Sequence, residues 1–274
     1  MGLNFHQLAV RFQGPVTLIN FFSRQPLTVL PAAEPRLTDR IGQPYYVRLN
    51  QAQALRQMHG MATRLNYEAV WMQFPAAGVW VATAQEFSRG TDADVRAFLP
   101  DPTDLGFPDL VCHHIHPNAF GHAHRAAAYA DLSDTYHYND LNKIALALAQ
   151  WYLAMPSYST PDQLSDLRGS FARARIYGAG KIKERLVSPL GVFEWQVLDP
   201  ENRAGYDQLR RMLHGFDQLL SPYQALRQIG RDRLLRFASN DVERAKFVQS
   251  TAREIDEECR PAVRAAFYPI GDFK

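Results

Sequence analysis

Residues 109–117 read DLVCHHIHP, an apolar run that carries three histidines and ends at a proline. Such a run predicts a strand, and Pro117 ends it because proline cannot donate to a sheet ladder. Side chains alternate between the two faces of a strand, so His114 and His116 share one face and His113 points to the other. Two imidazoles on one face can bind a single metal ion. The stretch therefore predicts a metal site at the end of a strand.

The histidines of the chain gather around this strand. Six of the nine lie between Cys112 and Asp140, namely His113, His114, His116, His122, His124 and His137. Imidazole is a preferred ligand of zinc, so we expect a divalent ion, Zn²⁺, on His114 and His116. Asp140, at the start of the following helix, would be the third ligand. The fourth position would then stay open for water, as in catalytic zinc sites.

Apolar periodicity divides the rest of the chain into helices and strands. A spacing of three and four residues predicts helices over 50–66 and 139–153. Runs rich in large apolar residues predict strands over 67–74, 78–84, 109–116, 171–177, 181–187 and 191–198. Beyond Pro200 the pattern is helical to the end of the chain. This order predicts an α/β or α+β fold, a mixed sheet flanked by helices, with an all-α appendage at the C-terminus.

The length of 274 residues allows one large core or a core with a smaller appendage. We expect three parts: a strand and loop segment over 1–44, a metal-binding domain over 45–200 and a helical appendage over 201–274. The boundary at 200 rests on the change from mixed to purely helical pattern. In this interpretation the helical tail binds a partner protein.

Composition narrows the class of protein and its surroundings. With 46% hydrophobic and 21% charged residues, the chain has ordinary globular usage. A net charge of +2 is too mild for a nucleic-acid binder. No apolar run is long enough to cross a membrane, and residues 1–13 lack the pattern of a secretory signal. We therefore expect a cytoplasmic protein, in which the two cysteines stay thiols.

Three features together resemble a known family. The motif His114-Ile115-His116-Pro117, the helix-opening Asp140 and the upstream strand residue Glu68 are similar to the JAMM metalloprotease pattern of the JAB/MPN fold. That pattern is a glutamate, then His-x-His-Pro, then Ser-x-x-Asp, and the resemblance covers roughly residues 45–200. It implies a zinc peptidase or isopeptidase acting on a protein or peptide substrate, such as a ubiquitin-like conjugate. It also implies metal ligands at His114, His116 and Asp140, with Glu68 as general acid and base.

The chain departs from the family at the serine. Where the pattern has Ser-x-x-Asp, the sequence reads His137-Tyr138-Asn139-Asp140. His137 would then donate a hydrogen bond to the oxyanion, or Ser133 would do so from the preceding loop. The glycine-rich run that usually follows the family's glutamate is missing after Glu68, so Glu86 is a second candidate for its role.

Two other functions fit part of the same stretch. Cys112 to Pro117, followed by Asn139, resembles the opening of an HNH nuclease, in which His113 would bind metal and His114 would act as general base. The third histidine of that motif is missing, and the mild net charge argues against a nuclease. The other alternative is an inactive JAB-like scaffold that binds a partner without hydrolysis.

Overall fold

The computed structural model describes twelve stretches of the chain, and every structural statement below concerns these residues. They are 16–20, 26–31, 33, 36–37, 45–64, 69–75, 78–84, 98–99, 110–116, 138–157, 165–218 and 222–273. The strands are β1 (Val16–Asn20), β2 (Pro26–Pro31), β3 (Tyr45–Arg48), β4 (Val70–Phe74), β5 (Val79–Ala84), β6 (Phe98–Leu99), β7 (Leu110–Ile115), β8 (Ile182–Ser188), β9 (Gly191–Val197) and β10 (Val263–Pro269). The helices are α2 (Gln51–Arg64), α5 (Tyr138–Leu153), α6 (Asp166–Tyr177), α7 (Arg203–Gln218), α8 (Pro222–Ile229), α9 (Arg231–Ser239), α10 (Asp241–Glu258) and the short 3-10 helix η3 (Ile270–Phe273).

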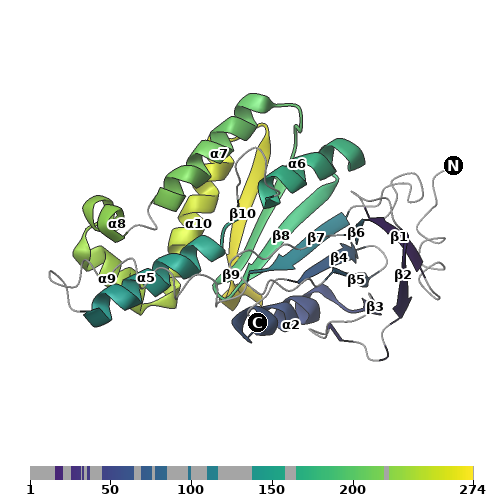
Figure 1. Ribbon diagram of the computed structural model, residues 1–274, viewed down its shortest axis with the longest axis horizontal. Coiled ribbons are helices and arrows are strands. Elements are labelled where there is room, and N and C mark those ends of the chain that lie inside the picture. The colour runs from purple at the N-terminus through teal and green to yellow at the C-terminus, as the bar shows by residue number, and fades with distance from the viewer. Residues whose placement is uncertain are drawn as a thin grey trace.

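These strands form one mixed sheet. Its order is β10-β9-β8-β7-β4-β5-β3-β2-β1-β6. The pairs β7/β8 and β2/β3 are parallel, and the other neighbours are antiparallel. Helices cover both faces (Figure 1), with α2 on one side and α6, α7 and α10 on the other. The mixed α/β class expected from the sequence is confirmed.

Two apolar cores lie on the two faces of the sheet. On one face α2 packs through Leu55 and Met58 against β-strand residues that include Trp71 and Trp80. The larger core, on the other face, joins residues of α5 and α6 to α7–α10 and to β8, β9 and β10. Because both faces are covered, a central strand such as β7 is buried along its whole length.

Several predicted elements match the structure closely. The helix expected over 50–66 is α2, and the one expected over 139–153 is α5. The strands expected over 67–74 and 78–84 are β4 and β5, which pair antiparallel. The strands expected over 181–187 and 191–198 are β8 and β9. None of the helices in the described ranges is both long and apolar enough to span a membrane.

The strand predicted over 171–177 is wrong, because these residues belong to helix α6. The sequence FARARIY alternates apolar and polar residues and so imitates a strand. The local signals for a helix lie outside that window. Ser165 caps the N-terminus by accepting a hydrogen bond from Arg168 N, and Gly178 ends the helix with a φ of 101°.

The prediction of a purely helical tail is also wrong. Residues 263–269 form β10, which pairs antiparallel with β9 along seven register positions. Val263, Ala265 and Phe267 alternate toward the larger core, which α5 and α6 share with the C-terminal helices. The described part of the tail therefore packs into the same core as the strands that precede it.

If this core unfolds as one unit, a small cavity in α10 will destabilise the whole protein. Val248 is fully buried in the larger core, whereas Val242 on the same helix is 59% exposed. We expect Val248→Ala to lower the free energy of unfolding by about 2 kcal/mol. Val242→Ala should change it by less than about 0.5 kcal/mol. Chemical denaturation followed by circular dichroism measures both. A separate transition for the C-terminal residues would contradict a shared core.

Candidate metal centre

The two central histidines are held by strand β7 and its neighbours. His114 lies opposite Val70 of β4 and Leu186 of β8. His116 follows the strand directly, and its backbone N–H donates to the carbonyl oxygen of Val187 at 3.0 Å. The extended backbone thus continues past the end of β7. As the alternation predicts, both imidazoles lie on one face, and both are buried.

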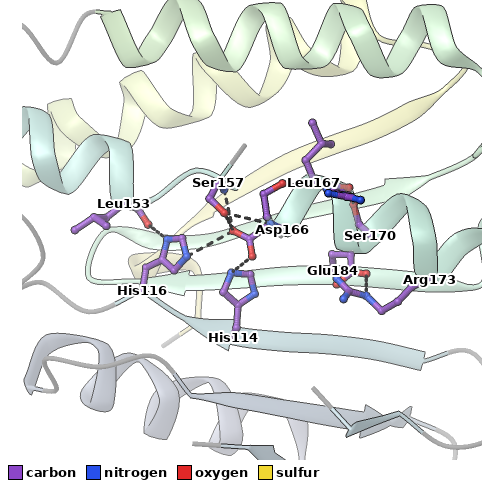
Figure 2. Close-up of polar contacts among 11 residues, drawn as sticks. His114, His116, Leu153, Ser157, Asp166, Leu167, Ser170, Arg173 and Glu184 are labelled. Carbon is purple, nitrogen blue, oxygen red and sulfur yellow. Dashed lines mark hydrogen bonds and ion pairs between the residues drawn. The ribbon is translucent and has the colours of Figure 1, made fainter. Parts of the chain in front are cut away.

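Asp166 completes a group of three possible metal ligands (Figure 2). It is the first residue of α6, and its carboxylate faces both imidazoles. Its Oδ1 lies 3.3 Å from Nε2 of His114, and its Oδ2 lies 3.6 Å from Nε2 of His116. One ligand atom from each of the three residues falls within 4.8 Å of the others. Two imidazoles and a carboxylate this close form a donor set suited to zinc.

Ser157 fixes the orientation of the Asp166 carboxylate. Both the backbone N–H and the hydroxyl of Ser157 donate to Oδ2 of Asp166, each at 2.8 Å. In turn, the N–H of Asp166 lies 3.2 Å from the serine Oγ. Burial alone would raise the pKa of Asp166, but His114 and these hydrogen bonds hold it well below its usual range. The carboxylate is therefore ionised at neutral pH.

The hydrogen bonding of His116 determines which nitrogen faces the centre. Its Nδ1 lies 2.9 Å from the carbonyl oxygen of Leu153, which can only accept, so Nδ1 carries the proton. Burial, and to a smaller extent His114, lowers the pKa of His116 to about 4, and the ring is neutral at pH 7. Its Nε2 then presents a lone pair toward an ionised carboxylate. Two acceptors facing each other favour a cation between them, so these residues fit a bound metal ion.

No protein-family model, curated protein or solved structure matches this chain.

The structure brings together two of the residues predicted from the sequence and adds a third. His114 and His116 lie side by side as expected, and Asp166 stands with them. Asp140 lies in the first turn of α5, and its side chain is outside the described residues, so its role as ligand stays a prediction. Four further candidates also fall outside the described residues, namely Glu68, Glu86, Ser133 and His137.

Asp166 and Ser157 are not among the site residues predicted from the sequence. The signal for Asp166 was present in the sequence. Ser165 followed by an acidic residue is typical of a helix N-terminus, where a carboxylate is also favoured by the helix dipole. Ser157 lies nine positions before Asp166 in the chain.

His113 belongs to the opposite face of the sheet. It is fully buried, its Nε2 lies 2.9 Å from Oε1 of Gln73, and its ring packs 4.6 Å from that of Trp80. Burial lowers its pKa well below the usual value, which keeps the ring neutral in the core. The nuclease alternative needs His113 and His114 to act at one site. His113 contacts Gln73 and Trp80 on one face of the sheet, whereas His114 contacts Asp166 on the other, which argues against a nuclease site.

Exchanging one carboxylate at a time identifies the third ligand. We expect wild-type protein to bind about one Zn²⁺ per chain and Asp166→Asn, which keeps the shape but loses the charge, to bind none stoichiometrically. Asp140→Asn tests the ligand predicted from the sequence: retained zinc would leave the carboxylate role to Asp166, and loss of zinc in both variants would make Asp140 a further ligand. Elemental analysis after gel filtration measures both. Retention by Asp166→Asn together with loss from Asp140→Asn would return the role to Asp140.

Removing the hydroxyl that orients Asp166 should weaken the site without abolishing it. We expect Ser157→Ala to lower zinc affinity about tenfold, as is usual for residues that orient a metal ligand. The backbone N–H of Ser157 still donates to Oδ2 in this variant, which explains a partial effect. Competition with a chromophoric chelator gives the affinity. Ser170→Ala serves as control. Ser170 is buried on α6, the helix that carries Asp166, and its hydroxyl donates to Leu167 O. Equal losses in the two variants would contradict a specific role for Ser157.

Proposed function

We propose that this protein is a zinc-dependent amide hydrolase, a peptidase or isopeptidase similar in its centre to the JAMM enzymes. The observation that carries the proposal is the buried group of His114, His116 and Asp166. Two imidazoles and one carboxylate leave room for a fourth ligand, which is how catalytic zinc differs from structural zinc. The buried thiol of Cys112 is not part of this group.

The residues of the chain have separate tasks in this proposal. His114, His116 and Asp166 would hold the ion, and Ser157 and Leu153 orient two of these three side chains. A bound zinc ion supplies a water whose pKa is about 7 and a Lewis acid for the scissile carbonyl. The chain must then supply a proton carrier, since the leaving amine departs poorly as an anion.

Glu68 is our candidate for the proton carrier. It directly precedes Ala69, whose carbonyl oxygen accepts a hydrogen bond from the N–H of Ile115 at 3.0 Å. Val70, two positions after Glu68, is the register partner of His114. These contacts tie the start of β4 to the part of β7 that carries the histidines, which supports the proposal. Glu86 is the second carboxylate candidate.

The substrate we propose is a protein or peptide amide, with a ubiquitin-like conjugate as the first to test. His137 or Ser133 would donate a hydrogen bond to the oxyanion, a contribution of about 3 kcal/mol in other hydrolases. A partner-binding role for the helical tail remains part of this proposal. An inactive scaffold with the same fold would bind zinc or a partner but hydrolyse nothing.

Replacing the proton carrier should separate catalysis from metal binding. We expect Glu68→Gln to reduce hydrolysis of a ubiquitin-like fusion or a peptide amide by about 10² to 10⁴ while zinc content stays unchanged. Glu86→Gln is the matched control and should retain turnover. Rates on purified zinc-loaded proteins and elemental analysis provide the two readouts. Unchanged turnover in Glu68→Gln, with loss in Glu86→Gln, would reassign the role. A zinc-loaded wild type without amide hydrolysis would favour the scaffold.

A further inference from the structure

A buried ion pair lies beside the candidate metal centre, on the same face of the sheet (Figure 2). Nε of Arg173 donates to Oε1 of Glu184 at 2.7 Å, and the two side chains are 16% and 2% exposed. Burial alone would lower the pKa of Arg173, but the Glu184 carboxylate raises it, so the guanidinium stays charged. The pair links α6 to β8, two elements that both border the metal centre.

The positions of the two partners connect the pair to the metal ligands. Arg173 follows Asp166 by seven residues, or about two helical turns, so both side chains lie on the same side of α6. Glu184 pairs in register with Cys112, which shares a strand face with His114. The ion pair and the contact of Asp166 with His114 thus tie the same helix to the same face of the sheet at two points.

Gly169 makes room for this arrangement. A Cβ atom at that position would lie 3.0 Å from Nη1 and 3.4 Å from Nη2 of Arg173. Glycine inside a helix costs about 1 kcal/mol relative to alanine. The guanidinium packs against helix backbone that a side chain would otherwise cover. Gly169 therefore leaves free the space that the Arg173 guanidinium occupies.

The energetics of the pair argue against a purely stabilising role. Buried ion pairs are often no more stabilising than apolar residues of the same size, because both charges lose their hydration. Unlike apolar packing, such a pair fixes the position and orientation of one element relative to the other, here of α6 relative to β8.

We infer that Arg173 and Glu184 are positioning residues for the metal centre: they fix α6 on β8 so that the Asp166 carboxylate meets His114 and His116. This inference rests on the proposed metal site. It assigns to Arg173 and Glu184 an effect on metal binding that acts through the position of α6. Its consequence is that metal affinity depends on the pair more strongly than stability does.

The neighbouring ion pair on the other face of the sheet is a matched control. Nε of Arg185 lies 2.6 Å from Oε2 of Glu194, and the side chains are 12% and 15% exposed. Residues 184 and 185 are adjacent in β8, so their side chains point to opposite faces. The control pair joins β8 to β9, on the face of the sheet opposite to α6.

The test compares two double variants as purified full-length proteins. Arg173→Met/Glu184→Met replaces the pair by apolar side chains of similar size, and Arg185→Met/Glu194→Met does the same to the control. Zinc affinity is measured by chelator competition, and unfolding by denaturant. Co²⁺ is loaded as a spectroscopic probe, because its visible absorption reports ligand geometry. We expect about tenfold weaker zinc binding and an altered Co²⁺ spectrum only in the first variant, with stability equal to or above wild type.

Each outcome has a distinct meaning. If wild type binds zinc and the first variant binds it equally well with an unchanged spectrum, the positioning role is wrong while the metal centre stands. Equal weakening in the two double variants would also overturn it. A wild type that binds no zinc refutes both the metal centre and this inference. Should the first variant not fold, Glu184→Gln, which keeps the shape of the side chain, is expected to weaken zinc binding severalfold, and unchanged affinity there overturns the inference.

Discussion

The contact between the Asp166 carboxylate and the two imidazoles of β7 is the constraint on which the rest of the account depends. These groups come from segments about fifty residues apart in the chain, and each would be costly to bury alone. Their burial is tolerated because hydrogen bonds orient two of the three side chains, His116 through Leu153 O and Asp166 through Ser157. The lone pair of the neutral His116 ring and the ionised Asp166 carboxylate then face one another. A cation between these two acceptors would be attracted to both.

The large core explains why this contact can be rigid. β7 is buried on both faces, and α6 packs on the sheet with Phe171 against Tyr206 of the neighbouring helix α7. Strand β10 extends the sheet at β9, so residues late in the chain help to support the helix that carries Asp166. The site therefore depends on long-range packing as well as on the local motif that carries its histidines.

The sequence predicts features that depend on neighbouring residues better than features that depend on packing between distant segments. His114 and His116 could be predicted to share a face, because the side-chain period of a strand fixes this without knowledge of the fold. Asp166 could not be predicted in the same way, since only tertiary packing brings the start of α6 to the histidines of β7. The alternation of FARARIY favoured a strand, yet the capping residues Ser165 and Gly178 produce a helix. β10 was missed because a short strand followed four helices and finds its partner, β9, far away in sequence.

The most direct test of the central claim is the position of a bound ion in a crystal grown with zinc. Anomalous diffraction at the zinc absorption edge locates the ion independently of any assumption about ligands. The account predicts one peak per chain, at about 2.0 to 2.2 Å from Nε2 of His116, a ring nitrogen of His114 and a carboxylate oxygen of Asp166, with no sulfur ligand. Zinc-loaded crystals without a peak between these three residues, or with the ion on other ligands, would contradict it.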